Sequence, residues 1–453
     1  MEPGESITVS GMTATARFLE HLSQAIRIDT VSHDGASDTG PFVEFHRFLA
    51  RTYPTMWSRL EVERFNDLSL LLTWPGSDTT LAPVILMAHQ DVVPVEPSSM
   101  NRWSKLPFAG ESTDTHVVGR GAIDDKASLI AILESVEALL EDGASPTRTL
   151  ILAFGHDEEA MGALGAASMA AELEKRGIRA ELVLDEGGFV TEGVVPGTRK
   201  PVALLGVGEK GYLDVEIAAT GDPGHSSVPP RNTAIGILAK AIRRLMDNRP
   251  QPRVETQAPF FEAAAAAARG PSAKVLASIP RLGKAAEALL SRRATTDALI
   301  RTTVAPTRIE GGVKANVLAA SARVLINFRI IPGDTVESTL DHVRRTVGKD
   351  VTVKALEGWD PPPMSSTSSE AYRTMAETIE EVFPDSVVAP WVVVGATDAR
   401  YFSSISDSVF RFLPFRLDAD ELAGFHGIDE RMRRTDAEPA VRFYTRLIQR
   451  LCM

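Results

Sequence analysis

The chain has 453 residues, of which 44% are hydrophobic and 24% are charged, and its net charge is −12. That length exceeds one ordinary hydrophobic core, so we expect two domains in a soluble globular protein. The acidic balance argues against nucleic acid as a partner, and the single cysteine, Cys452, excludes a disulfide framework within one chain.

The N-terminal segment shows no pattern typical of a targeting signal. Residues 1–16 lack a basic stretch followed by an apolar run, which argues against a signal peptide. No stretch of about 20 apolar residues predicts a membrane span. We therefore expect a cytoplasmic protein. Helical periodicity predicts a first helix over residues 12–27.

Strands and helices are expected to alternate in the first half of the chain. Short apolar runs predict buried strands, and the periodic segments between them predict helices. The expected strands are Leu70–Trp74, Val84–Met87, Thr149–Phe154 and Leu182–Leu184, and the expected helices are Lys126–Leu140 and Ala163–Lys175. This order predicts an α/β domain in which a mostly parallel sheet is flanked by helices.

The pattern changes after the GVGEKG segment, residues 206–211. The following strands alternate apolar and polar residues, as in a sheet with one solvent-exposed face. They are Tyr212–Ala218, Thr302–Ile309, Arg323–Ile330 and Val351–Ala355, with helices over Ala234–Met246 and Val336–Arg345. This order predicts a ferredoxin-like α+β domain over residues 212–357, inserted into a domain formed by 1–211 and 358–453. The Ala-rich tract Phe261–Arg293 predicts added helices, which can line an apolar pocket, pack internally or form a dimer contact.

Five segments spread along the chain carry residues that can bind a divalent metal. They are MAHQD, GRGAIDD, HDEEA, LVLDEGG and GFHGIDE. Histidine and carboxylate ligands without thiolate are typical of a hydrolytic zinc or manganese centre rather than a closed structural one. Each segment also has an ordinary structural interpretation, so the inference depends on the whole set.

His89 and Asp91 stand two residues apart at the end of an expected strand, so their side chains point to one face. His89 can then bind a metal through one ring nitrogen while Asp91 accepts the other N–H, which fixes the tautomer. The alternative is an ordinary hydrogen bond of a histidine at a strand end.

The acidic residues of the set stand where strands end or a helix begins. Asp124 precedes the helix at Lys126, where a carboxylate also serves as a cap. Glu158 and Glu159 follow a buried strand, where a salt bridge to an arginine is the alternative, and Asp185 ends the next strand. Open α/β sheets place their sites at the carboxyl ends of parallel strands, so these positions predict a site.

His426, between glycines on an expected loop, would alone be a surface histidine. As a second imidazole it completes one histidine and one terminal acid for each of two metals, with a bridging carboxylate between them. The order and spacing of the motifs, from His89 to His426, resemble the co-catalytic zinc metallopeptidases that include aminoacylase, glutamate carboxypeptidase and succinyl-diaminopimelate desuccinylase. Within that family, LDEGGF, VGEKG and GHSSVPP are most similar to the branch of the Gly-X carboxypeptidase (carboxypeptidase S) and the N-fatty-acyl-amino-acid hydrolases.

The resemblance implies a discontinuous catalytic domain, an inserted lid and dimerisation domain, and two zinc ions, with cobalt or manganese as alternatives. It implies that one metal is held by His89, Asp124 and Asp185 and the other by Asp124, Glu159 and His426, with Asp124 bridging. Asp185 is preferred over the alternative Glu186 because it comes directly off the strand. A cis peptide bond between Asp124 and Asp125 is also implied.

Two metals about 3.5–4 Å apart can share a water and lower its pKa to about 7. Glu158 is then expected to take the proton of that water and to deliver it to the leaving amine. The resemblance implies that His225, in GHSSVPP, stabilises the oxyanion in the active site of the other subunit of a homodimer. It also implies that substrate contacts come from Asn316, Arg329 and Gly395. The planar guanidinium of Arg329 suits a free carboxylate.

The expected function is hydrolysis of the amide bond of N-acyl amino acids or of the C-terminal residue of short peptides. A dinuclear phosphoesterase uses similar ligands, but it would require more arginine or lysine close to the metals than these motifs contain. A non-catalytic, metal-stabilised dimer is a further alternative. Glu158, which is not needed as a ligand, argues against it.

Overall fold

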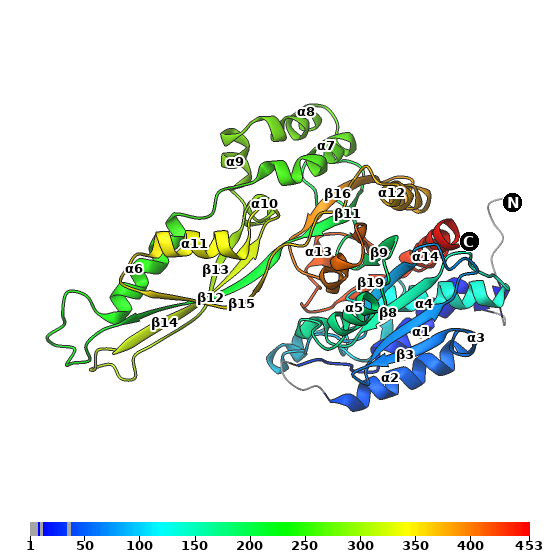
Figure 1. Cartoon of the computed structure of the whole chain (residues 1–453), viewed down its shortest axis with the longest axis horizontal. Helices are drawn as coiled ribbons and strands as arrows, with labels where there is room; N and C mark the ends of the chain where they lie inside the picture. The colour runs from blue at the N-terminus through cyan, green and yellow to red at the C-terminus, as the bar shows by residue number, and fades with distance from the viewer. Residues whose placement is uncertain (1–7, 10–11, 34–37) are drawn as a thin grey trace.

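The computed structural model describes residues 8–9, 12–33 and 38–453. The expectation of no signal peptide concerns residues 1–16, which lie partly outside the described residues. The first helix predicted from periodicity is present as α1 (Ala14–Ile26). Figure 1 shows a large body that holds α1 and the C-terminus and a smaller sheet that extends away from it.

The large body is built on one mixed sheet, which confirms the predicted α/β fold class. Its strand order is β18-β10-β11-β17-β9-β5-β8-β4-β3, and β16 pairs with β11. Strand β5 is parallel to both of its neighbours, β8 and β9, so the carboxyl ends of these three strands lie at one edge of the sheet. The strands are β3 (Glu61–Phe65), β4 (Ser69–Trp74), β5 (Val84–His89), β8 (Leu150–Gly155), β9 (Leu182–Asp185), β10 (Val190–Thr191), β11 (Val202–Glu209), β16 (Val387–Val393), β17 (Val409–Arg411) and β18 (Arg416–Leu417).

Helices cover both faces of this sheet, which explains the continuous apolar runs of its central strands. Side chains alternate between faces along a strand. In β4, Leu70 and Leu72 belong to the apolar cluster with α1, α4 and α14, whereas Leu71 belongs to the cluster with α5 on the other face. The remaining helices of the large body are α2 (Thr39–Thr52), α3 (Pro54–Arg59), α4 (Lys126–Glu141), α5 (Ala166–Lys175), α12 (Glu370–Val382), α13 (Ala419–Leu422) and α14 (Ala437–Cys452).

The smaller sheet has the β-α-β-β-α-β order predicted from the sequence. Its elements are β12 (Gly211–Thr220), α6 (Ala234–Asp247), β13 (Thr303–Gly311), β14 (Ser321–Ile330), α11 (Val336–Val347) and β15 (Thr352–Trp359). The strand order is β13-β14-β12-β15, and all pairs are antiparallel. The inward-facing residues of β12 and β14 pack with α6 and α11 in one apolar cluster. We call this assembly the small-sheet unit.

The Ala-rich tract lies in the expected helices, α7 (Ala258–Ala267), α8 (Pro271–Ser278) and α9 (Lys284–Leu290), and α10 (Ala294–Ile300) follows it. Phe260, Phe261 and Ala264 of α7 pack with Val202 and Ala389, which belong to β11 and β16. Of the roles considered for this tract, the contacts of α7 therefore show internal packing against the large sheet.

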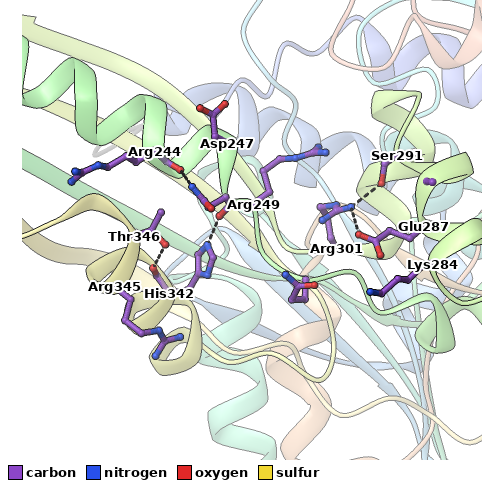
Figure 2. Close-up of a pocket in the computed structure, with 13 residues that line it drawn as sticks. Arg244, Asp247, Arg249, Lys284, Glu287, Ser291, Arg301, His342, Arg345 and Thr346 are labelled. Atoms are coloured by element: carbon purple, nitrogen blue, oxygen red, sulfur yellow. Dashed lines mark hydrogen bonds and ion pairs between the residues drawn. The ribbon is translucent and has the colours of Figure 1, made fainter.

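A cavity of about 770 Å³ lies between α6, α9 and α11 (Figure 2). Its lining includes five arginine or lysine side chains and two acidic ones, and two of the cationic side chains are paired within the protein with a third acidic residue. Arg249 and Arg301 both pair with Asp297, at 2.6 and 2.7 Å, and Arg301 also donates to Ser291 Oγ at 2.7 Å. None of the residues expected to bind metal or substrate lines this cavity.

Candidate metal centre

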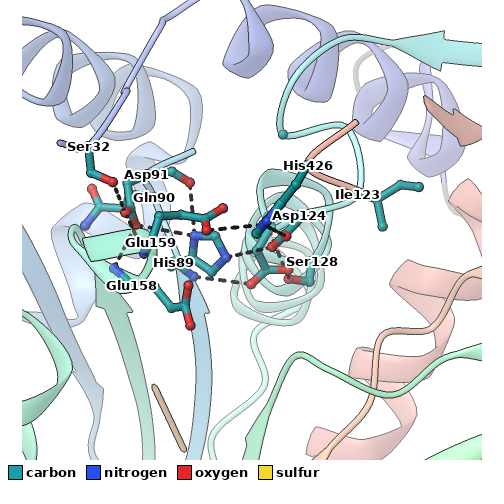
Figure 3. Close-up of polar contacts among 12 residues, drawn as sticks. Ser32, His89, Gln90, Asp91, Ile123, Asp124, Ser128, Glu158, Glu159 and His426 are labelled. Carbon is teal, nitrogen blue, oxygen red and sulfur yellow. Dashed lines mark hydrogen bonds and ion pairs between the residues drawn. The ribbon is translucent and has the colours of Figure 1, made fainter. Parts of the chain in front are cut away.

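Four of the five expected ligands, together with the expected base Glu158, come from separate elements that meet at one edge of the large sheet (Figure 3). His89 ends β5, Glu158 and Glu159 follow β8 in a short 3-10 helix, and Asp124 directly precedes Asp125 and α4. His426 lies on the loop after α13. The edge forms because β5 and β8 are parallel neighbours, so their carboxyl ends coincide. The Asp124–Asp125 peptide bond is cis, as expected.

Asp124 lies between the two histidines. His89 Nε2 is 2.9 Å from Asp124 Oδ1, and His426 Nε2 is 3.1 Å from Asp124 Oδ2. His426 Nε2 is also 3.2 Å from Glu159 Oε2. Each oxygen of Asp124 therefore faces a different imidazole, which is the arrangement that a carboxylate bridging two cations requires.

These residues fit a metal centre. The ligand atoms of Asp124, Glu159 and His426 lie within 4.8 Å of one another, and so do those of His89, Glu158 and Glu159. Glu159 Oε1 is buried and has no hydrogen-bond partner among the residues that the structure describes. A buried carboxylate oxygen without a donor is costly, and a bound cation would remove that cost.

The charges around the centre also favour a cationic occupant. Burial, together with the nearby charge of Glu159, raises the pKa of Glu158 well above its ordinary value. Burial and the charge of Asp124 do the same for the pKa of Glu186. Like charges that are removed from water repel each other strongly unless a counter-ion is present.

Asp91 contacts His89 and the segment that carries the two glutamates. His89 Nδ1 lies 3.0 Å from the backbone carbonyl of Asp91 and 3.3 Å from its Oδ1. The same carboxylate accepts the backbone N–H groups of Glu158 and Glu159, at 3.2 and 3.1 Å, and the Ser32 hydroxyl at 2.7 Å. Asp91 thus orients the His89 ring and fixes the start of the glutamate segment at once.

Asp185 and Glu186 differ in what holds them. Asp185 is buried, and its Oδ2 accepts the backbone N–H of Ala399 at 2.7 Å. The Glu186 carboxyl is close enough to Asp124 for their charges to interact, which contributes to its raised pKa. Neither residue belongs to the two groups of converging ligand atoms found in the described part of the chain.

His225 and Asn316 lie together, far from the candidate centre. They occupy the loops after β12 and β13. Ser226 N donates to the backbone carbonyl of Asn316 at 3.3 Å, and His225 and Val317 form an isolated antiparallel β-bridge. Strand β12 has 10 residues and begins where the chain leaves the large sheet, so these loops lie about 30 Å along the small sheet from that point. In Figure 1 they form the end of the unit that points away from the large body.

Arg329, in contrast, lies at the end of the small sheet that adjoins the large one. It pairs with Tyr212 across the β12–β14 ladder, and its guanidinium lies 5.0 Å from the Tyr212 ring centre. Tyr212 stacks on Trp359 at 4.7 Å. Gly395 lies on the loop after β16, and a Cβ added there would meet no atom within 4 Å. The expected substrate residues are thus placed in two regions rather than one.

Sequence reasoning assigned no role to Arg400, which connects the two units beside the glutamate segment. Its guanidinium lies 4.8 Å from the Trp359 ring centre. Its Nη2 donates to the carbonyl of Met161 at 2.6 Å. Met161 is 239 residues away from Arg400 in the chain, so this contact leaves no local signal in the sequence.

Comparisons with known proteins agree with this geometry. The family model "Peptidase family M20/M25/M40" matches residues 85–450. The chain belongs to this family. It is 37% identical over 439 residues to a probable carboxypeptidase S-like 2 of Dictyostelium discoideum, covering 95% of this chain and 84% of that protein. It is also 37% identical over 441 residues to the N-fatty-acyl-amino acid synthase/hydrolase PM20D1 of Xenopus tropicalis, covering 96% and 85%.

Among solved structures, an M20 family metallo-carboxypeptidase from Sulfolobus solfataricus has the same fold. Its TM-score is 0.70 at 18% identity, and the match covers 95% of this chain and 98% of that one. The predicted family and enzyme class, a metallopeptidase or amidohydrolase, are thus confirmed, and the phosphoesterase alternative finds no support. Within the described residues, no helix is long and apolar enough to cross a membrane. The cytoplasmic location stays a prediction.

Proposed function

We propose that this protein is a dinuclear metal-dependent hydrolase that cleaves the amide bond of N-acyl amino acids or of the C-terminal residue of short peptides. The observation that carries the proposal is the convergence of two histidines and two carboxylates, namely His89, His426, Asp124 and Glu159. The names of the relatives, a carboxypeptidase S-like protein and an N-fatty-acyl-amino acid synthase/hydrolase, support the substrate class.

In this proposal His89 and Asp124 would hold one metal, and Asp124, Glu159 and His426 would hold the other. Two bound zinc ions, or cobalt or manganese in their place, would polarise the scissile carbonyl and activate the attacking water. For the remaining acidic ligand on the His89 side we propose Glu186 rather than Asp185. The reason is that Asp185 already accepts a backbone N–H, whereas the Glu186 charge lies close to Asp124.

Metal content separates the two acids. We expect Glu186→Gln to bind about one metal ion fewer than the native protein, and Asp185→Asn to retain the native metal content. Elemental analysis of both purified variants measures this directly. The reverse result would assign the ligand to Asp185.

Glu158 is proposed as the group that moves the proton. Its carboxyl accepts no hydrogen bond from the described residues, and its raised pKa suits both removing a proton from water and returning it to the leaving amine. Arg329 is proposed to bind the free carboxylate of the substrate, and Gly395 to leave room for the substrate beside the centre. In a homodimer, Asn316 and His225 of one subunit are proposed to complete the active site of the other subunit.

A homodimer follows from that last assignment. We propose that residues 1–211 and 358–453 act as the catalytic domain and residues 212–357 as a lid and dimerisation domain. The position of His225 about 30 Å along the small sheet supports its use by the other subunit. Apolar side chains near that end, Val228, Ile309 and Val313, are 79%, 65% and 94% exposed, which supports a contact between copies.

The test is a hydrolysis screen of N-acyl amino acids and dipeptides, run with and without a chelator. We expect turnover of at least one of these classes, its loss after chelation, and its return when zinc, cobalt or manganese is added. Activity that survives complete removal of metal would refute the proposal. Hydrolysis confined to phosphate esters would also refute it.

A further inference from the structure

Glu430 is a fully buried carboxylate that lies against the loop carrying Asp124. Its side chain is 0% exposed. Oε1 accepts the backbone N–H groups of Ile123 and Asp124, at 2.8 and 3.1 Å. Oε2 accepts the N–H of Gly121 at 3.0 Å and Nη1 of Arg120 at 2.7 Å. Both oxygens therefore hold the backbone of a single loop in place.

Glu430 also belongs to the loop that carries His426. It directly precedes β19 (Arg431–Arg433), which pairs with β7 (His116–Val118), the strand that leads into the Asp124 loop. Its carbonyl accepts Gly119 N at 2.9 Å. Arg120, which is bound to the Glu430 carboxylate, donates its Nη2 to the Gly427 carbonyl at 2.9 Å. One buried ion pair thus connects the two loops that supply Asp124 and His426.

Apart from the contacts of its Nε2 with Asp124 and Glu159, the position of His426 is set by its loop. Its side chain is 56% exposed, and its φ of +53° lies in the left-handed region, which is uncommon for residues other than glycine. The next residue, Gly427, packs closely against the start of the same loop, since an added Cβ there would lie 2.2 Å from the Ala423 carbonyl oxygen. The alignment of His426 with Asp124 therefore depends on how its loop is tied down.

We infer that Glu430 is a positioning residue that sets the spacing between Asp124 and His426, and thereby the affinity of the metal these two residues hold with Glu159. This inference rests on the proposed metal centre. Residues that support metal ligands from behind contribute about 10–100-fold to metal affinity. Glu430→Gln keeps the shape, but its NH₂ group cannot accept the backbone N–H groups. We expect this variant to bind that metal about 10–100-fold more weakly.

The experiment is a calorimetric titration of the metal-free full chain with Zn²⁺, arranged as a double-mutant cycle with His426→Ala. In the native background, Glu430→Gln should weaken one of the two binding events by the stated factor. In the His426→Ala background the same change should alter the remaining affinity by less than about 3-fold, because the spacing no longer matters. Equal effects of Glu430→Gln in both backgrounds would overturn the inference.

Glu137→Gln is the matched control. Glu137 is also buried, at 3% exposure, and accepts two backbone N–H groups, those of Thr55 and Met56 at 2.9 and 2.7 Å, but it contacts neither ligand loop. We expect it to lower the melting temperature with metal affinities unchanged. If Glu430→Gln does not fold, Arg120→Gln tests the same link between the loops.

The outcomes separate this inference from the proposed function. Native protein that binds no metal refutes the proposed metal centre itself. Native protein that binds two metals, while Glu430→Gln (or Arg120→Gln in its place) binds both with native affinity or with the same change as Glu137→Gln, refutes only the role of Glu430. A selective loss at one site that depends on His426 supports it.

Discussion

The neighbouring residues Glu158 and Glu159 allow the proposed mechanism to be tested with one matched pair of substitutions. In the proposal Glu158 moves the proton, whereas Glu159 holds a metal. Replacing each glutamate by glutamine changes the same atoms at adjacent positions. Only the roles differ, so the two variants should fail in different ways.

The proposed role of Glu158 determines how large the loss of activity and the change in stability should be. Loss of a general base and acid costs about 10²–10⁴-fold in rate, which corresponds to about 2.7–5.4 kcal/mol in the activation barrier. The Glu158 carboxylate accepts no hydrogen bond from the described residues, and its raised pKa reflects burial and the neighbouring charge of Glu159. Glu158→Gln therefore removes an unfavourable buried charge and breaks no bond, so the melting temperature should stay equal or rise.

The assay combines kcat/KM for an N-acyl amino acid, metal content and thermal melting. We expect Glu158→Gln to lose about 10²–10⁴-fold in kcat/KM with native metal content. Glu159→Gln should lose activity together with about one metal ion, because it replaces a proposed ligand. Near-native activity of Glu158→Gln, or loss of metal from that variant, would refute the proton-transfer role of Glu158.

Three further predictions concern the small-sheet unit and Lys210, the residue that directly precedes it. Arg329→Ala should lower kcat/KM about 10–100-fold for substrates with a free carboxylate and leave their carboxamides nearly unchanged, and equal effects on both would remove Arg329 from that role. Mixing His225→Ala with Glu158→Gln protein should restore about a quarter of native activity if sites are shared in a two-fold dimer, whereas mixtures shown to contain heterodimers but lacking activity would reject sharing. Burial lowers the pKa of Lys210 to about 7, so the folded chain binds fewer protons there than the unfolded chain above that pH. Its contribution to stability should therefore rise by up to about 1.4 kcal/mol per pH unit between pH 8 and 9.5, and Lys210→Met, compared by guanidinium unfolding, should lack this rise.

The part of the site that the sequence predicted is the part that depends on local rules. His89 and Glu159 follow strands whose apolar runs are unmistakable, and the carboxyl ends of parallel strands must meet at one edge. The helix after Asp124 and the ferredoxin-like order of the small-sheet unit likewise follow from periodicity and element order. For these residues, knowing the strand or helix was nearly enough to know the position.

What the local sequence cannot indicate depends on contacts between segments far apart in the chain. One such contact is the hydrogen bond that Asp185 accepts from the backbone N–H of Ala399, more than 200 residues away, on which our preference for Glu186 rests. Glu430 is the last residue of the GFHGIDE segment. Nothing near it in the sequence indicates that its partners are the backbone N–H groups of Ile123 and Asp124. A metal centre built from strand ends can be recognised by its ligands, but the groups that set the spacing of those ligands become visible only when the loops are seen together.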